Sequence, residues 1–333
     1  MDQKEQVYFQ QQGIICNRVI ASGAFGVVYN VYSTQYKSSF ALKRVPESMF
    51  NESELECLKS IDNPHIVSLY KTFRFNGNCY MLMEYCPNNL NNLIVPDVCM
   101  NPLDILKYSY EMILSLKACH EKNIAHCDIK PTNFLIDKYG RIKISDFGLS
   151  CQFYHNEKCS VFQGTKLFMA PEIFNAANYN PMKADIWAIG VTLYLMATGR
   201  FPFYSQDLRS LTNKLEKGIY SNELVEDRLL ANVIDSCLEI DPNQRPTVDQ
   251  LLAMPYFYQD RDTVYDKNLN VSTNTPATTC SKSQLSPQII FRPKVIKRNS
   301  RCSFFSPSPI GERLHLSRPL SRSVDRICNS DPK

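Results

Sequence analysis

The spacing of apolar residues divides the chain into two parts with different periodicity. Residues 13–83 contain short β-branched and aromatic runs separated by turn-forming residues, which is typical of strands. The clearest of these runs are residues 27–32, 40–45 and 79–84. One stretch differs, because residues 47–61 place Met49, Leu55, Leu58 and Ile61 at helical spacings and end before Asn63-Pro64. We therefore expect a sheet accompanied by a single helix.

Beyond Asn88 the periodicity becomes helical. Residues 105–120 carry a stripe of apolar side chains at Leu106, Tyr110, Ile113, Leu114 and Leu116. Further helical patterns lie at residues 208–217, 229–238 and 247–253. The longest apolar run, residues 186–197, is shorter than the roughly 20 residues needed to span a bilayer. We predict a buried helix there, no transmembrane segment, and a helical part larger than the sheet part.

Composition and charge exclude several classes of protein. A chain of 333 residues with 44% hydrophobic and 21% charged residues can bury a substantial core, so it is not wholly disordered. The net charge of +4 is uneven, because residues 281–333 hold 11 Lys and Arg against 3 Asp and Glu. Residues 1–280 therefore carry a charge of −4 and lack the basic footprint of a nucleic-acid-binding protein.

The two ends of the chain differ in composition from its middle. Residues 1–12 show no apolar stretch behind a basic head, so no secretory signal is visible and we expect an intracellular, cytoplasmic location. Residues 281–333 include 11 Ser and 6 Pro, a composition typical of a disordered tail. Its basic charge is compatible with three alternatives: a solvated tail without a binding function, phosphorylation at serines near arginine such as Ser321, or docking to an acidic partner or an anionic membrane surface.

The 13 cysteines are scattered along the chain and include no Cys-x-x-Cys pair. This pattern favours buried thiols over a zinc site.

A glycine-containing segment between two predicted strands is the first candidate for phosphate binding. It comprises Ala21, Ser22, Gly23, Ala24, Phe25, Gly26, Val27 and Val28. By itself it fits a plain turn as well as a clamp whose backbone N–H groups face a phosphate. Lys43, about twenty positions after the loop, favours the clamp, because an ammonium there can reach bound phosphates. Glu54 on the predicted helix is the candidate to orient this lysine, with Glu52 and Glu56 as exposed neighbours.

The helical part contains the most specific motifs. They are His126-Cys127-Asp128-Ile129-Lys130-Pro131-Thr132-Asn133, Asp146-Phe147-Gly148 and Ala170-Pro171-Glu172. Together with the glycine-containing segment and Lys43, in this order and spacing, they resemble the eukaryotic protein kinase family over residues 14–257, about three quarters of the chain. The resemblance implies an α+β, bilobal protein-kinase-like fold, with a small antiparallel-sheet N-lobe carrying one helix and a larger, mainly helical C-lobe.

The resemblance also implies a division of the chain. We expect an N-terminal extension at residues 1–13 and a kinase domain at residues 14–258. Within the domain, the N-lobe would span residues 14–83, the hinge 84–87 and the C-lobe 88–258. Residues 259–333 would form the basic, Ser/Pro-rich and disordered tail.

By resemblance, each part of a phosphoryl-transfer site has a candidate residue. The reaction depends on positioning and charge neutralisation, which require a cation, metal-holding groups and a base. Asp128 would be the catalytic base and Lys130 would neutralise the γ-phosphate of ATP. Asp146 would bind a Mg²⁺ that bridges the phosphates, and Asn133 would hold the second Mg²⁺.

The resemblance further assigns the residues that would bind the nucleotide. Lys43 would contact the α- and β-phosphates and pair with Glu54. The remaining candidates line the loop, the adenine site, the back of the pocket and the hinge: Ala21, Ser22, Gly23, Ala24, Phe25 and Gly26; Val28, Ala41 and Leu135; Met83; and Glu84 and Cys86.

Framework residues of the family also have counterparts in this chain. Leu58, Leu69, His126 and Phe147 resemble its apolar spine, which is anchored on an aspartate that corresponds to Asp185. Glu172 and Arg245 match the family's buried ion pair, for which a planar guanidinium is suited.

Several residues bear on the class of kinase. Asp128-Ile129-Lys130-Pro131 and Gly164-Thr165 resemble serine/threonine kinases, and the helical part looks most like the calcium/calmodulin-dependent kinase group. Met169 stands where proline-directed kinases carry an arginine, which disfavours Ser-Pro substrates. Leu90, Thr132 and Leu195 occupy positions where related kinases place acidic residues that bind substrate arginine, so a strong arginine preference is not expected.

Two departures from the family pattern affect mechanism. Ala21 replaces the first loop glycine, which leaves Gly23 and Gly26 to approach the phosphates. Cys127 replaces the arginine that normally pairs with a phosphate on the activation segment. We therefore hypothesise that activity does not require phosphorylation within residues 149–169.

The resulting prediction is an ATP- and Mg²⁺-dependent protein serine/threonine kinase. The alternative is a catalytically silent kinase-like scaffold that acts by binding partners. The intact set of Lys43, Glu54, Asp128, Asn133 and Asp146 disfavours it, because silent relatives commonly lose at least one of these. A small-molecule kinase is disfavoured by the intact segment from Asp146 to Glu172, the peptide-docking floor of the family.

Overall fold

The computed structural model describes residues 1–23, 26–153, 163–175 and 179–258. The predicted tail at residues 259–333 lies outside the described residues, and so do the loop residues Ala24 and Phe25. Across the described ranges, no helix combines the length and the apolar character needed to cross a membrane.

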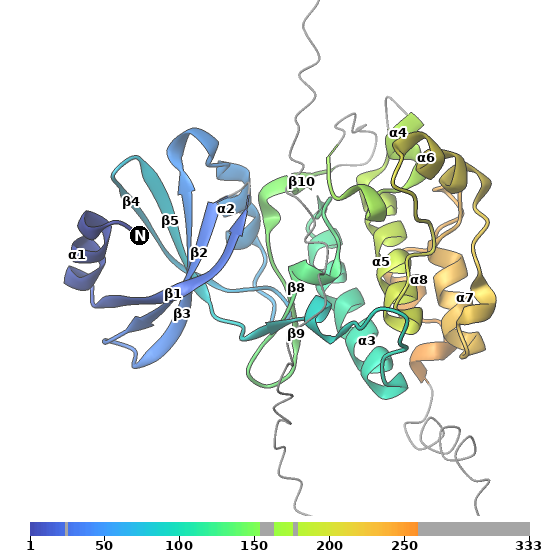
Figure 1. Cartoon of the computed structure of the whole chain (residues 1–333), viewed down its shortest axis with the longest axis horizontal. Helices are drawn as coiled ribbons and strands as arrows, with labels where there is room; N and C mark the ends of the chain where they lie inside the picture. Colours follow the sequence, from blue (N-terminus) through green and yellow to red (C-terminus); the bar gives the residue numbers. More distant parts are fainter. Residues whose placement is uncertain (24–25, 154–162, 176–178, 259–333) are drawn as a thin grey trace, which may run out of the picture. The chain divides into compact units, whose positions relative to one another are not determined.

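Five strands form an antiparallel sheet in the order β1-β2-β3-β5-β4 (Figure 1). Their bounds are β1 (Ile14–Gly23), β2 (Gly26–Ser33), β3 (Ser38–Pro46), β4 (Leu69–Phe75) and β5 (Asn78–Glu84). The three predicted strands fall within β2, β3 and β5, which confirms them. Because side chains alternate along a strand, the register places Val28, Lys43 and Met81 on one face and Tyr29, Leu42 and Leu82 on the other. The first of these faces belongs to the candidate site.

The predicted N-terminal extension contains a helix that packs on the second face of the sheet. Helix α1 (Gln3–Gln11) begins with a capping box formed by Asp2 and Glu5. Phe9, 1% exposed, lies among aromatic rings, with centroids 4.8 Å from Tyr80 and 5.4 Å from Phe73. Glu5 is buried too, and it accepts a hydrogen bond from the Tyr80 hydroxyl at 2.6 Å. The extension therefore contributes to the core of the sheet part.

The helix predicted at residues 47–61 is shorter than expected. A 3₁₀ turn, η1 (Glu47–Met49), is followed by a break, and helix α2 spans Glu52–Ser60. The break arises because Asn51 adopts an extended conformation and its side chain accepts a hydrogen bond from the Ser53 amide. Asparagine at this position caps a new helix instead of continuing the preceding turn. Met49, expected on the apolar face, is consequently 48% exposed.

The second part of the chain is mainly helical, as predicted. Its helices are α3 (Pro102–His120), α4 (Pro171–Asn175), α5 (Pro181–Thr198), α6 (Leu208–Lys217), α7 (Arg228–Cys237) and α8 (Val248–Leu252). The 3₁₀ turns are η2 (Leu90–Leu93), η3 (Pro131–Asn133), η4 (Phe147–Leu149), η5 (Lys166–Phe168), η6 (Asn222–Leu224) and η7 (Pro255–Tyr258). Each helical pattern found in the sequence coincides with a helix to within a few residues.

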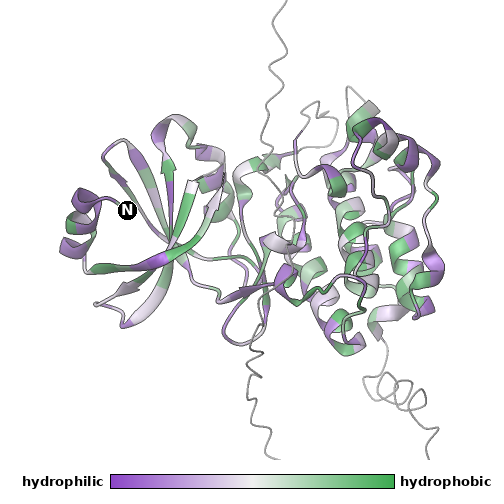
Figure 2. Ribbon diagram, in the orientation of Figure 1, coloured by the Kyte–Doolittle hydropathy of each residue, from purple (hydrophilic) through white to green (hydrophobic). Residues whose placement is uncertain are grey.

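Helix α5 forms the centre of this helical core. It is apolar on all sides and almost entirely buried, which confirms the buried helix predicted at residues 186–197. Helices α3 and α7 both pack against it, and Figure 2 shows hydrophobic residues on all three. Asn180 caps its N-terminus, and it ends at Gly199 in a left-handed conformation with φ of 68°.

Two small antiparallel sheets flank the segments that contain Asp128 and Asp146. One has the order β6 (Asn88–Asn89), β8 (Phe134–Ile136) and β9 (Ile142–Ile144). The other pairs β7 (Ile124–Ala125) with β10 (Cys151–Gln152). The segment between β7 and β8 contains Asp128, and the segment between β9 and β10 contains Asp146. The short strands therefore bring the two carboxylates into one region.

Candidate active site

A cavity of about 640 Å³ is lined by both parts of the chain. Most of the predicted nucleotide-binding and metal-holding residues contribute to it: Ala21, Ser22, Gly23, Gly26, Val28, Ala41, Lys43, Glu54, Met83, Glu84, Cys86, Asn133, Leu135 and Asp146. Its volume lies in the range typical of small-molecule sites. Asp128 and Lys130 do not line this cavity, and Ala24 and Phe25 lie outside the described residues.

The glycine-containing segment is the turn between β1 and β2, where Gly23 pairs with Gly26. Gly26 has a φ of 126°, and a Cβ added there would lie 2.1 Å from the carbonyl oxygen of Arg44. This position therefore requires glycine, because any side chain would collide with the backbone of β3. Ala21 pairs with Val28, directly after a register shift between Val19 and Ala21.

Lys43 on β3 lies between two carboxylates. Its Nζ is 2.5 Å from Oε1 of Glu54 and 3.0 Å from Oδ1 of Asp146. Glu54 is buried in α2, whereas the neighbouring Glu52 and Glu56 are exposed. The choice among these three glutamates made from the sequence therefore agrees with the geometry.

The charges of this cluster support one another. Burial by itself would lower the pKa of Lys43, but the nearby charges of Glu54 and Asp146 outweigh burial and raise that pKa. Burial would raise the pKa of Asp146, but the Lys43 ammonium lowers it below its usual value. At neutral pH the cluster therefore consists of a lysine cation and an Asp146 anion.

Asp128 is held by three side chains. Its Oδ2 accepts hydrogen bonds from Lys130 Nζ at 2.6 Å and from Asn133 Nδ2 at 3.1 Å. Its Oδ1 accepts from the Thr165 hydroxyl at 2.9 Å, and that hydroxyl accepts from Lys130 at 3.0 Å. Asn133 also donates to the backbone carbonyl of Asp128 at 2.8 Å. The three predicted catalytic residues are thus brought together, and Thr165 joins them.

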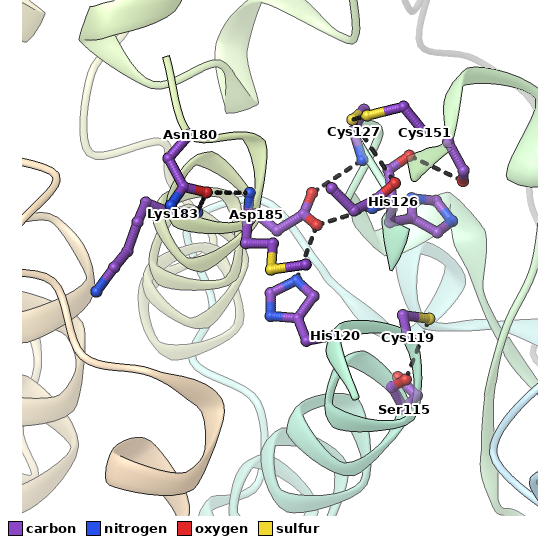
Figure 3. Close-up of polar contacts among 12 residues, drawn as sticks. Ser115, Cys119, His120, His126, Cys127, Cys151, Asn180, Lys183 and Asp185 are labelled. Atoms are coloured by element: carbon purple, nitrogen blue, oxygen red, sulfur yellow. Dashed lines mark hydrogen bonds and ion pairs between the residues drawn. The ribbon is translucent and has the colours of Figure 1, made fainter. Parts of the chain in front are cut away.

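The backbone turn before Asp128 is fixed by Asp185 of α5, whose carboxylate points toward His126 and Cys127 (Figure 3). The Asp185 carboxylate accepts from the amides of His126 and Cys127 at 2.8 and 2.9 Å, and it lies 3.1 Å from Nε2 of His120. Cys127 has a left-handed φ of 64°, which L-residues rarely adopt without support. The buried carboxylate supplies that support, because it binds both amide groups at the turn.

The predicted apolar spine is also assembled in part. Phe147 is fully buried, and its ring lies 5.1 Å from that of His126. His126 is fixed in turn, because its Nε2 lies 3.0 Å from the carbonyl oxygen of Ser145. Leu58 on α2 is buried, and Leu69 is partly buried against the same core.

The end of β5 and the residues that follow it form one wall of the cavity. Met83 is buried on the same sheet face as Ala41, with which it pairs directly. Burial, and then the charge of Glu84, raises the pKa of the Cys86 thiol to about 12. Glu84 pairs with Lys143 of β9 at 2.9 Å, a contact that the sequence analysis missed because the two residues share no local motif.

The cavity is also lined by Tyr85 and Pro87 of the predicted hinge and by Thr132 of the predicted motif. The sequence analysis did not identify the remaining lining residues: Arg18, Val19, Ile20, Val67, Asn88, Asn89, Asn92 and Ser145. The three asparagines lie in β6 and η2. Their close spacing in the sequence could have been used to predict a polar wall of the cavity.

The Glu172–Arg245 pair forms as expected. The Arg245 guanidinium donates to both carboxylate oxygens of Glu172, at 2.6 and 2.8 Å. It also donates to the backbone carbonyls of Lys183, Glu239 and Ile240, so the buried cation is surrounded by acceptors. Glu172 lies in the first turn of α4, so the pair anchors the chain where the segment from Asp146 to Glu172 ends.

Comparison with known proteins identifies similar sequences. The pattern that defines the family described as "Protein kinase domain" matches residues 15–257. "Sperm motility kinase Z" of Mus musculus is 32% identical over 213 residues, which cover 64% of this chain and 43% of that protein. "3-phosphoinositide-dependent protein kinase B" of Dictyostelium discoideum is 31% identical over 91% of this chain and 34% of that protein. "CBL-interacting serine/threonine-protein kinase 18" of Arabidopsis thaliana is 28% identical over 72% of this chain and 48% of its own length. The chain thus spans less than half the length of these curated relatives.

Proposed function

The chain belongs to the protein kinase domain family, and from this premise we propose that it transfers the γ-phosphate of ATP to serine and threonine hydroxyls of protein substrates. The observation that carries the proposal is the presence of two assembled clusters. One is Lys43 between Glu54 and Asp146, and the other is Asp128 with Lys130, Asn133 and Thr165. A scaffold that only binds partners would have no need for either.

We assign the nucleotide to the 640 Å³ cavity. The apolar side chains of Val28, Ala41 and Leu135 would enclose the adenine ring, with Met83 behind it and the backbone of residues 84–86 reading its edge. Lys43 lies on the face of β3 that lines the cavity and would contact the α- and β-phosphates, because Glu54 of α2 holds its ammonium in place.

The donor set suits Mg²⁺. Asp146 offers a carboxylate with a lowered pKa, and Asn133 offers a carbonyl oxygen, since its amide nitrogen already donates to Asp128. Hard oxygen donors of this kind are the ligands that Mg²⁺ prefers. Bound there, the metal would neutralise the negative charge of the phosphates.

Asp128 is proposed as the catalytic base. Its carboxylate would orient a substrate hydroxyl and accept its proton, and its position is set by Thr165, Asn133 and Lys130. Lys130 lies 2.6 Å from Asp128 and would place a positive charge where negative charge develops on the transferred phosphoryl group.

The test of this function is transfer of ³²P from ATP and Mg²⁺ to an arrayed Ser/Thr peptide library. Asp128→Asn and Lys43→Met are the matched inactive controls. Transfer by the wild-type chain that both variants lose would support the proposal and define the sequence preference. Folded wild-type protein that binds ATP but transfers no phosphate would favour the scaffold.

Finer assignments remain proposals that rest on the sequence. We place the chain nearest the calcium/calmodulin-dependent kinase group, on the look of its helical part, and keep residues 14–258 as the kinase domain. The sequence preference measured on the peptide library would test the assignment to this kinase group.

The need for ATP supports a location inside the cell. We propose that the protein is cytoplasmic, which imaging of a fluorescent fusion would check. We propose that the basic tail binds an acidic partner or an anionic membrane surface. Deleting residues 281–333 would test whether binding to either one requires the tail.

Activation is also proposed to be independent of phosphorylation in residues 149–169. The reason is that Cys127 cannot pair with a phosphate as an arginine would. The residues to change singly to alanine are Ser150, Ser160 and Thr165; Thr165 also contacts Asp128, and Ser160 lies outside the described residues. Ser160→Ala should therefore retain activity, and a loss of turnover in the folded variant would overturn this view.

A further inference from the structure

Two cysteines meet beside the proposed catalytic base. The sulfur atoms of Cys127 and Cys151 lie 3.7 Å apart (Figure 3). Cys127 directly precedes Asp128, in the segment between β7 and β8 that we call the catalytic loop (residues 126–133). Cys151 starts β10, within the segment from Asp146 to Glu172 that we call the activation segment. The contact therefore joins the two segments that carry the chemistry.

The backbone explains why the thiols meet. Strands β7 and β10 pair antiparallel, with Cys151 opposite Ala125. Cys127 follows Ala125 by two residues, so its side chain is a diagonal neighbour of Cys151, within reach across two strands. The pairing is reinforced at both ends, because the Ser150 hydroxyl donates to the His126 carbonyl at 3.2 Å and the Phe153 amide to the Asn123 carbonyl at 2.7 Å.

The pair is also accessible. Cys127 and Cys151 are half-buried, whereas Cys57, Cys119 and Cys237 are fully buried. A small oxidant can reach the first two thiols more easily than the other three. The sulfurs must approach by about 1.7 Å to reach the disulfide length of about 2.05 Å. Side-chain rotation with a small backbone adjustment can provide this movement.

From this geometry we propose that Cys127 and Cys151 form an oxidation site, in which a hydroperoxide such as H₂O₂ converts the two thiols into a disulfide. One sulfur attacks a peroxide oxygen, the O–O bond breaks, and a sulfenic acid and one water result. The second sulfur then attacks the sulfenic sulfur, the S–O bond breaks, and a second water leaves. In total, two thiols lose two electrons and two protons, and one H₂O₂ becomes two waters.

The link would tie the catalytic loop to the activation segment. It forms in an arrangement in which Lys43 is already paired with Glu54 and Asp128 with Lys130. The disulfide therefore holds the assembled site together and keeps the β7–β10 pair closed, without dismantling the catalytic contacts. The proposal concerns a modification of this chain and goes beyond the assigned transfer activity.

Peptide mapping of the 333-residue chain tests the link directly. After treatment with H₂O₂ and alkylation of the remaining thiols, trypsin releases Cys127 in residues 123–138 and Cys151 in residues 144–158, each as the only cysteine of its peptide. We expect these two peptides to be joined, with the loss of two hydrogens, and to separate on treatment with dithiothreitol. Cys151→Ser should abolish the joined species, and Cys99→Ser, at an exposed cysteine, should leave it unchanged.

Two further readouts follow the structural consequence. Amide hydrogen exchange of residues 150–153 should slow by about tenfold on oxidation and recover on reduction. Peptide phosphorylation by the wild type should differ by less than about twofold between the oxidised chain and the same chain reduced again with dithiothreitol, because the link leaves the catalytic contacts in place.

Several results would overturn the proposal. One is the absence of the joined peptides under conditions that oxidise Cys99. Another is joining of Cys151 mainly to Cys57, which trypsin releases in residues 45–59, or to Cys159, in residues 159–166. A loss of activity on oxidation that dithiothreitol reverses and that Cys151→Ser prevents would overturn the claim that the link preserves the assembled site.

Discussion

Replacing Glu172 by glutamine should destabilise the domain far more than the matched change in an exposed pair. The Arg245 side chain is 0% exposed and the Glu172 side chain 11% exposed. Glu172→Gln removes the negative charge and turns an N–H donor toward the guanidinium, while one oxygen remains as an acceptor. Breaking a buried ion pair by removing one partner costs about 3–5 kcal/mol. The retained acceptor and the three backbone carbonyls around Arg245 favour the lower end, about 3 kcal/mol.

That cost predicts a measurable change in melting temperature. In a domain of 150–250 residues each kcal/mol shifts Tm by about 2–4 °C, so Glu172→Gln should lower Tm by about 6–12 °C. The control is Asp97→Asn, because Asp97 pairs with Arg200 and both side chains are more than half exposed. This change should shift Tm by less than about 4 °C.

Thermal unfolding followed by circular dichroism, at one scan rate for all variants, provides the comparison. If Glu172→Gln melts within 2 °C of the wild type, as an order-of-magnitude limit, the buried pair does not anchor the segment as argued. Equal losses in both variants would show that burial is not what makes the pair important.

Three other predictions follow from the site and the fold. Thr165→Ala should lower kcat by about 10- to 100-fold in peptide phosphorylation, with Thr165→Ser restoring most of it, because the hydroxyl donates to the charged carboxylate of Asp128; an unchanged kcat would contradict this. Because the pKa of Asp146 is lowered in the fold, its charge stabilises the protein above its unfolded value of about 3.9, and this contribution is lost as the pH falls through the lower folded value. In denaturant titrations, the difference in unfolding free energy between wild type and Asp146→Asn should therefore be constant from about pH 7 to 5 and shift only near and below pH 4, and a change centred near neutral pH would refute it. Phe9→Ala should cost about 3–5 kcal/mol of stability in the same assay, whereas Val7→Ala, at a side chain 49% exposed, should cost far less; equal effects would mean that α1 does not pack as described.

Much of the fold could be predicted because its signals are local. The strand runs and the helical stripes depend on the alternation of neighbouring residues, and each coincides with an element of the structure. The helix predicted at residues 47–61 was too long, because Asn51 ends one turn and caps the next helix. Propensity over a window cannot reveal such a break, because one side-chain hydrogen bond decides it.

The site was predicted to a similar extent, for a different reason. Residues that perform phosphoryl transfer occur as fixed types in a fixed order, so Lys43, Asp128, Asn133 and Asp146 could be chosen before any geometry was known. The structure brings these residues together, while their roles remain proposals. Lys143 escaped notice, because its partner Glu84 is distant in sequence and no motif connects the two.

By itself, the sequence determined the order of strands and helices and the candidate residues for the proposed phosphoryl transfer, since both are encoded in short spacings. Only the tertiary structure decided which side chains meet across long separations. Packing carries Phe9 of the N-terminal extension into the aromatic core of the sheet, and the β7–β10 register places Cys151 beside Cys127. The physical reason is that contacts between distant segments depend on strand register and on the burial of whole faces, which are properties of the assembled core and not of any local run of residues.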